Sequence, residues 1–338
     1  MLRRRFVVVH RWLGLVVGLH LLLLGLTGVL MALGEPWERV SGHRTSGTGK
    51  VTLAQVMEAV RVKTGATQDP GWVKAPPEGS GLDWRMLIDL APEGGKRQRA
   101  YVHVDSGTGE VTKVVPYEAS VKGASFSFHH ELFLSGKVGR PIVAVSGMLS
   151  LLLSILGVVI WWRGGRGPTL ALRMKGLRAP SLRARLLALH ELIAVWTVVG
   201  LVGSTLSGIV LAKPDWFGGS LGKPPPTSAR VDFARLTDAL AGQPFEQVRF
   251  APNADTVAIT LIRGGQFTVD PQTFVITPRP APPSTFVSVM RTLHEGHYWG
   301  PVGTVVITLV GLVPLVLFVS ALLSWWLGRK AQSPQVAE

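Results

Sequence analysis

Residues 10–33 read HRWLGLVVGLHLLLLGLTGVLMAL, and residues 190–212 read HELIAVWTVVGLVGSTLSGIVLA. Each stretch begins with a histidine and continues as an apolar run. Each run is long enough for a membrane helix, since about 20 residues span a hydrocarbon core of about 30 Å. Aligning His10 with His190 also aligns Thr27-Gly28-Val29 with Ser207-Gly208-Ile209, without a gap. The repeated pattern predicts a membrane protein made of two related halves.

A second repeat links the two apolar segments that follow these stretches. It aligns His130-Glu131 with His294-Glu295. In the same register, Gly136, Gly139, Gly147 and Trp161-Trp162 align with Gly300, Gly303, Gly311 and Trp325-Trp326. The first and third segments then run in one direction and the second and fourth in the other, as in a parallel internal repeat.

Composition agrees with a membrane fold. The chain has 338 residues, of which 47% are hydrophobic and 17% charged, and its mean hydropathy is +0.31. The apolar stretches lie at 12–34, 141–162, 186–212 and 302–327. The predicted fold class is a membrane α-helical bundle of four transmembrane helices with a two-fold internal repeat, carrying two small α+β domains outside the bilayer.

Basic residues predict the orientation. Arginines precede the first apolar stretch (Arg3, Arg4, Arg5), basic residues separate the second from the third (Arg163, Arg166, Arg173, Lys175, Arg178, Arg183, Arg185), and Arg329 and Lys330 follow the fourth. By the positive-inside rule, both termini and the middle loop face the cytoplasm of a bacterial inner membrane. The first apolar stretch is too long for the core of a signal peptide and is expected to be retained. The net charge of +14 is partly this signal, so we expect membrane lipid, and no nucleic acid, as a partner.

The absence of cysteine limits the chemistry. With no cysteine in the chain, disulfides, thiolate-ligated haem, covalently attached haem, iron–sulfur clusters and cysteine nucleophiles are excluded. A metal or haem must be held by histidine, methionine or oxygen ligands.

Two segments outside the apolar stretches are predicted to form small domains, at 36–125 and 214–290. In the first, residues 52–64 have helical spacing after a threonine, and strands are expected at 84–90 and 99–104 before a turn at 105–109. The second repeats this order with a helix near 232–241 and strands near 245–250, 256–262, 265–270 and 273–277. The full division is 1–35, 36–125, 126–163, 164–183, 184–213, 214–290, 291–328 and 329–338, alternating helix-bearing segments with extramembrane ones.

The chain resembles the PepSY-associated transmembrane helix family. The resemblance rests on HRWLGLVVGLHLLLLGLTGVL, on FHHELFLSGKVGRP and LHEGHYWGPVG before the second and fourth apolar stretches, and on the tryptophan pairs followed by basic residues. Members of this family include inner-membrane ferric-siderophore reductases that carry haem. The resemblance therefore implies a haem-bearing reductase with PepSY-like periplasmic domains. The second small domain departs from the family pattern because it lacks the glycine turn of the first.

The repeated histidines are the candidate cofactor ligands. Neutral imidazole is a good axial ligand of haem iron, and ionisable residues inside membrane spans are functional candidates. His10 and His190 are predicted to clamp one haem b near the cytoplasmic side, and His130 and His294 a second near the periplasmic side. With both iron faces occupied, the chemistry is outer-sphere electron transfer. The alternative is that His10 and His190 anchor the helices at the headgroup boundary.

Other residues are secondary candidates. His20, near mid-bilayer, and His129 and His297, beside the repeated pair, are alternative ligands. Gly14 and Gly18 share the helical face of His10 and leave room for a flat ring, or for helix packing. Glu131 and Glu295 either orient an imidazole or cap a helix.

Helix length predicts a break before the second membrane helix. The stretch from His130 to Trp162 would measure about 48 Å if it were fully helical, which exceeds the bilayer. The helix is expected to break near Gly136, Gly139 and Pro141, with His130 on a short interfacial helix, and the other half is expected to do the same near Gly300.

The leading hypothesis is a haem-b reductase of the inner membrane. It would take electrons from quinol or a donor protein and reduce a periplasmic ferric siderophore or other ferric chelate, releasing Fe(II). The alternative is a non-catalytic, membrane-anchored module whose PepSY-like domains bind a periplasmic protein. A permease is disfavoured because, apart from the histidines, the apolar stretches carry almost no charge.

Overall fold

The computed structural model describes two compact units. The described residues are 2–41, 51–77, 80–93, 96–163, 174–219, 231–241, 243–250, 257–261, 265–279, 285–296 and 299–330. One unit, the helix bundle, contains residues 1–34, 125–221 and 284–338. The other, the sheet unit, contains residues 35–124 and 222–283.

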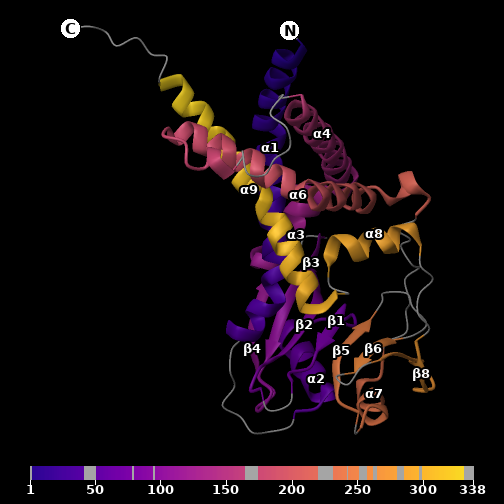
Figure 1. Ribbon diagram of the computed structural model, residues 1–338. Helices are drawn as coiled ribbons and strands as arrows, with labels where there is room; N and C mark the ends of the chain where they lie inside the picture. Colours follow the sequence, from indigo (N-terminus) through magenta and orange to yellow (C-terminus); the bar gives the residue numbers. More distant parts are fainter. Residues whose placement is uncertain are drawn as a thin grey trace. The chain divides into compact units, whose positions relative to one another are not determined.

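Four long helices form the bundle (Figure 1). They are α1 (Leu2–Ser41), α4 (Gly136–Trp162), α6 (Leu182–Ala212) and α9 (Gly300–Lys330). Each contains a stretch long and apolar enough to cross a membrane, which agrees with the four predicted spans. Large apolar side chains such as Val199 (82% exposed) and Val16 (74% exposed) lie on their outer faces, as expected for helices that face lipid.

Close backbone contact joins the helices. A Cβ at Gly25 of α1 would collide with the backbone carbonyl of Gly311 in α9. A Cβ at Gly147 of α4 would lie 2.6 Å from Ile209 in α6. Lipid tails are as apolar as leucine, so helix association in a bilayer depends on such small residues and the van der Waals contact they permit.

A short helix precedes both α4 and α9. These are α3 (Val121–Glu131) and α8 (Phe286–Glu295). The chain leaves α3 through two left-handed residues, Leu132 (φ 56°) and Phe133 (φ 59°), and leaves α8 through Gly296 (φ 66°). The predicted helix breaks are confirmed, and α4 is accordingly only 27 residues long.

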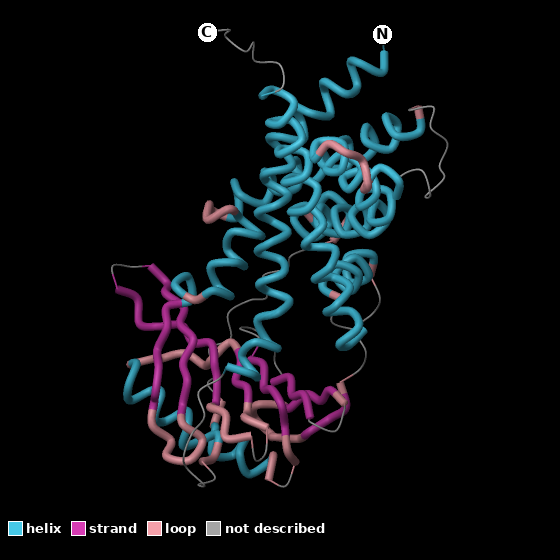
Figure 2. Tube along the Cα trace, turned by 60° about the vertical axis from the view of Figure 1, so that its left-hand side comes forward, coloured by secondary structure: helices cyan, strands magenta, loops and turns pink. Residues whose placement is uncertain are grey.

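The sheet unit is one antiparallel sheet with its two helices, α2 (Leu53–Thr64) and α7 (Phe233–Ala239), on one face (Figures 1 and 2). The strands are β1 (Trp72–Lys74), β2 (Trp84–Glu93), β3 (Lys96–Val104), β4 (Val111–Pro116), β5 (Phe245–Phe250), β6 (Val257–Leu261), β7 (Gln266–Val269) and β8 (Ile276–Pro278). Their order is β4-β3-β2-β1-β5-β6-β7-β8. The first strands after α2 and α7, which are β1 and β5, form the central pair. From this pair outward, each half of the sheet follows the order of the sequence, so that β4 and β8 are the two edge strands.

Local sequence explains the predicted elements. The Thr52 hydroxyl caps α2 in a reciprocal capping box with Gln55, which satisfies otherwise unpaired N–H groups. The Asp105 carboxylate accepts hydrogen bonds from the N–H groups of Gly107 (2.7 Å) and Thr108 (2.8 Å) in the turn after β3. The predicted helices and most of the predicted strands are confirmed, whereas the three-residue β1 was not predicted.

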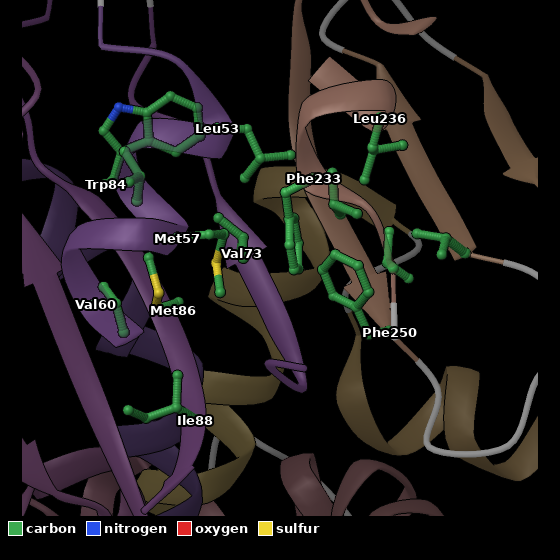
Figure 3. Packing of buried hydrophobic residues seen from close by; sticks show 14 of the residues in the cluster. Leu53, Met57, Val60, Val73, Trp84, Met86, Ile88, Phe233, Leu236 and Phe250 are labelled. Carbon is green, nitrogen blue, oxygen red and sulfur yellow. The ribbon is translucent and has the colours of Figure 1, made fainter. Parts of the chain in front are cut away.

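The two sequence segments of this unit share one hydrophobic core, where we expected two small domains. Antiparallel pairing of β1 with β5 places Val73 opposite Val248, and both side chains are fully buried. Figure 3 shows Met57 and Met86 from the first segment in the same cluster as Phe233 and Phe250 from the second. No sequence pattern indicated this joint, because a three-residue strand has too few residues for an alternating pattern.

Valine truncation on α2 is expected to separate core packing from surface effects. Val60 is 1% exposed and Val62 is 78% exposed. Val60→Ala should lower the free energy of unfolding by about 2 kcal/mol, since it removes buried methyl groups and leaves a cavity. Val62→Ala should change it by less than about 0.5 kcal/mol. Thermal unfolding of the full chain in detergent checks this, and equal losses in the two variants would contradict the packing described.

Candidate functional site

The ends of α3 and α8 pack closely against the starts of the membrane helices that follow them. A Cβ at Gly139 of α4 would collide with the carbonyl of Glu131, and a Cβ at Gly303 of α9 would collide with the carbonyl of Gly296. Glycine at these two positions therefore permits the sharp return of the chain. The return carries the histidines of α3 and α8 against α1 and α6.

His129 packs against α1. Its Nδ1 lies 2.9 Å from the Leu24 carbonyl oxygen and 3.2 Å from the Thr27 hydroxyl. A carbonyl oxygen only accepts hydrogen bonds, so Nδ1 carries the proton and donates. The Thr27 hydroxyl donates to backbone carbonyls of its own helix, which leaves its oxygen free to accept from Nδ1.

His294 makes the same contacts with α6, at the positions that the first repeat aligns with Leu24 and Thr27 of α1. Its Nδ1 lies 3.0 Å from the Ser204 carbonyl oxygen and 3.1 Å from the Ser207 hydroxyl. Ser207 in turn donates to carbonyls of α6. With Nδ1 protonated in both histidines, Nε2 of each neutral imidazole has a free lone pair, the form that binds a metal ion.

A glycine makes room for each ring. An added Cβ at Gly28 would lie 3.2 Å from Cε1 of His129, and one at Gly208 would lie 3.2 Å from Cε1 of His294. Each glycine is four residues after the carbonyl that accepts the hydrogen bond. In a helix, a side chain at that position lies beside the carbonyl. Glycine thus exposes the carbonyl to the imidazole.

The rings of His129 and His294 lie next to each other. Their centroids are 6.0 Å apart and their planes are inclined by 56°. The bundle therefore brings together two histidines from α3 and α8, each held by its Nδ1 on a different membrane helix.

His10 and His190 lie near one another at a second level of the bundle, close enough to interact electrostatically. His190 Nδ1 donates to the Leu317 carbonyl at 3.0 Å and lies 3.3 Å from the Ser320 hydroxyl of α9. His10 lies near the Leu153 carbonyl of α4, although its Nδ1 does not reach hydrogen-bond geometry with any described residue. The second repeat aligns Leu153 with Leu317, so both histidines contact the same point of the repeat.

A glycine four residues after the contacted carbonyl is also present beside His10. An added Cβ at Gly157, four residues after Leu153, would lie 3.2 Å from Cε1 of His10. The residue in the corresponding place beside His190 is Ala321. Three of the four histidines therefore meet a helix where a glycine follows the contacted carbonyl by four residues.

The two levels are separated along the helices. Leu24 follows His10 by fourteen residues and Ser204 follows His190 by fourteen, which corresponds to about 21 Å along a helix. Both levels fall within the membrane-spanning stretches of α1 and α6.

His130 occupies a different environment from its neighbour. Its ring stacks on Phe126, with centroids 4.1 Å apart and planes inclined by 20°. Burial, with His294 and the guanidinium groups of Arg140 and Arg291 nearby, lowers the pKa of His130 to about 4. The structure brings His129, and not His130, into the contacts that correspond to those of His294.

Burial also keeps the facing pair neutral. It is the largest cause that lowers the pKa of His129 to about 3, with His294 and His130 adding to it. Burial lowers the pKa of His294 as well. Both imidazoles are therefore uncharged at neutral pH, which is the protonation state that a metal ligand needs.

The two glutamates predicted beside the histidines form ion pairs. Glu131 accepts from Nε of Arg140 at 3.0 Å, and Glu295 lies 3.5 Å from Nη1 of Arg291. Arg140 on α4 and Arg291 on α8 are thus each paired with a glutamate, and both lie near His130.

The remaining predicted residues lie apart from the facing contacts. His20 of α1 interacts electrostatically with His129, and its Nε2 is buried without a hydrogen-bond partner among the described residues. Gly14 faces Leu153 at 3.7 Å and Gly18 faces Phe318 at 3.2 Å, measured from an added Cβ, which is helix packing. His297 lies outside the described residues.

The comparisons agree with the bundle. The model of the family described as PepSY-associated TM region matches residues 7–328. The chain belongs to this family. A search among curated proteins gives no match. Family membership, together with the four apolar helices, identifies a multi-pass membrane protein.

Alanine substitution at two glycines is expected to test the return of α3 onto α4. Gly139→Ala should destabilise the bundle by a few kcal/mol, because the new Cβ meets a backbone carbonyl that cannot move without shifting α3. Gly203→Ala in α6 is a matched control, since its Cβ would meet nothing within 4 Å. Thermal unfolding followed by tryptophan fluorescence should show a lower transition temperature for Gly139→Ala only. An unchanged transition in both variants would contradict the close approach.

Proposed function

We propose that this protein is a haem-b reductase of the bacterial inner membrane that passes electrons to a ferric chelate outside the cytoplasm. The observation that supports it is the facing pair His129 and His294, each anchored through Nδ1 to a main-chain carbonyl with Nε2 left available. A tandem repeat of two halves about a pseudo-two-fold axis accounts for the matched contacts and for the matching strand order of the two halves of the sheet.

The residues fit a bis-histidine haem. His129 and His294 would hold one haem through Nε2, because neutral imidazole is a suitable ligand of haem iron. The observed separation of His129 and His294 is 6.0 Å. His10 and His190 would hold a second haem, and haem bound in these places supplies one-electron transfer. We propose His129 and His294 as the ligands of the first haem. His130 packs beside His129 and is not a ligand.

The protein's own groups would control the chemistry. The hydrogen bonds to Leu24 and Ser204 fix the tautomer and orientation of each imidazole and raise its basicity as a ligand. Apolar burial of both levels excludes water and lowers the local dielectric constant.

The overall reaction balances with quinol as donor. One quinol oxidised to quinone releases two electrons and two protons, and the two electrons reduce two Fe(III) chelates to Fe(II). Fe(II) binds hard oxygen ligands more weakly, so the iron leaves its carrier. Two histidine pairs about 21 Å apart along the helices suit transfer from one side of the bilayer to the other. The positive-inside rule predicts that the termini lie in the cytoplasm and the sheet unit in the periplasm.

Adjacent histidine variants are expected to distinguish the ligands. His129→Ala and His294→Ala should each lose one of two haems, whereas His130→Ala should keep both, because its ring stacks on Phe126 outside the facing contacts. His10→Ala and His190→Ala should lose the other haem. The measurement is haem b content by the pyridine haemochrome method on purified protein, with a visible spectrum.

Two results would contradict this proposal. Purified parent protein without b haem would remove the reductase and favour a non-catalytic binding module. Loss of haem in His130→Ala with retention in His129→Ala would reverse the ligand assignment.

A further inference from the structure

One end of the helix bundle is basic and lacks nearby carboxylates. It is the end where α1 and α6 begin and α4 and α9 end, because the start of α1 meets α4 at Gly157 and the start of α6 meets α9 at Gly328. Residues 1–34, 132–190 and 296–337 contain no aspartate or glutamate. Exposed arginines lie on three of the four helices: Arg3, Arg4 and Arg5 on α1, Arg183 and Arg185 on α6, and Arg329 on α9.

The guanidinium of Arg183 lies against the last turn of α9. An added Cβ at Gly328 would lie 2.9 Å from Nε and 3.1 Å from Cζ of Arg183. The absence of a side chain at residue 328 therefore makes room for the guanidinium, which reaches from α6 to α9. Arg183 is nevertheless exposed, and it makes no hydrogen bond or ion pair with a side chain or carbonyl of the described residues. Its N–H donors are therefore available to a ligand.

A second guanidinium belongs to the same turn of α9. Arg329 follows Gly328, and its guanidinium lies 4.9 Å from the centroid of the Trp325 ring, so a cation–π contact restrains it there. The first carboxylate along α6 is that of Glu191, eight residues after Arg183, or about 12 Å of helix. The C-terminus of α9 supplies the equivalent of only about half a negative charge. Two arginines at this turn therefore leave an excess of positive charge, which favours a bound anion.

Apolar side chains beside these arginines select an amphiphilic anion. Leu182 precedes Arg183 and is 55% exposed, and Trp326 lies two residues before Gly328 and is 48% exposed. Both residues lie at the ends of helices apolar enough to cross a membrane, and tryptophan is enriched at the boundary between membrane and water. Guanidinium groups bind phosphate through parallel hydrogen bonds. A soluble phosphate would contact only the arginines, whereas a phospholipid would also cover the apolar side chains with its acyl chains.

We propose that Arg183, seated on Gly328, and Arg329 bind the phosphate group of an anionic phospholipid. The acyl chains of this lipid lie along α6 and α9. The lipid thereby bridges the two helices that position His190, whose Nδ1 donates to the Leu317 carbonyl of α9. Basic loops are attracted to an anionic leaflet whatever their geometry, but this site requires glycine at residue 328. It does not depend on the presence of haem.

Thermal unfolding of the full chain in neutral detergent tests the site, because a ligand that binds the folded state raises the transition temperature. Phosphatidylglycerol should raise it at concentrations at least about tenfold lower than phosphatidylcholine with the same acyl chains, since each arginine near the phosphate favours the anionic lipid. Added salt should weaken the effect. Inorganic phosphate at the same concentration should leave the transition unchanged, because it does not contact the apolar side chains.

Three variants separate the site from the overall charge of this end. Arg183→Gln should weaken phosphatidylglycerol binding by about fivefold, the effect of one basic side chain beside a lipid phosphate. Arg185→Gln removes the same charge from the same helix, but the Arg185 guanidinium donates to the Pro180 carbonyl at 3.4 Å, so the affinity should stay within about twofold. Gly328→Leu keeps every charge and displaces the Arg183 guanidinium, so it should weaken binding as Arg183→Gln does. Cooperative unfolding without lipid confirms that each variant is folded.

Several results would overturn the site. Equal losses of affinity in Arg183→Gln and Arg185→Gln, or unchanged affinity in Gly328→Leu, would show diffuse attraction to the basic end. Equal parent affinity for the two phospholipids would exclude selection of an anion, and stabilisation by inorganic phosphate alone would exclude a lipid as the required ligand. If Arg183→Gln unfolds at a lower temperature but binds phosphatidylglycerol as the parent does, Arg183 serves only to stabilise the end of α9.

Discussion

A hydrogen bond from a buried imidazole to a main-chain carbonyl of a membrane helix organises the bundle. Hydrocarbon offers no water to an unpaired polar group, so an imidazole that packs against a membrane span needs a partner from the protein. His129 and His294 find it at Leu24 and Ser204. This contact fixes the depth of each ring, and the chain must return sharply from α3 and α8 to make it. The breaks before α4 and α9, and the glycines that permit them, follow from that requirement.

The glycine four residues after the contacted carbonyl gives this contact a local sequence basis. Gly28 and Gly208 occupy aligned positions in the first quoted repeat. The structure shows that a side chain in their place would press on Cε1 of the facing imidazole. One helix can therefore accept a histidine from another without losing its own hydrogen bonds, because the carbonyl oxygen has a second lone pair.

Much of the fold was predictable because it depends on local patterns. Length and hydropathy predicted the four spans, the distance from His130 to Trp162 required a break, and the threonine before Leu53 marked the start of α2. The identity of the facing histidine was not predictable in this way. The second repeat aligns His130 with His294, but the contacts that correspond to those of His294 are made by His129, the residue before the aligned position. One residue turns a helix by about 100°, so the choice between His129 and His130 depends on how α3 is rotated against α1.

The pairing of β1 with β5 was also not predictable from the sequence, and it has a consequence for folding during synthesis. β1 ends at Lys74 and pairs with a strand that begins only at Phe245, after three of the four membrane helices. While α4 and α6 are being synthesised, the edge of β1 that later pairs with β5 has no partner strand. An edge of only three residues, ending in a lysine, is a poor template for other chains. Because β1 is so short, its unpaired edge is a poor site for aggregation until the β1–β5 pairing, which joins residues far apart in the sequence and is slow to form, completes the sheet.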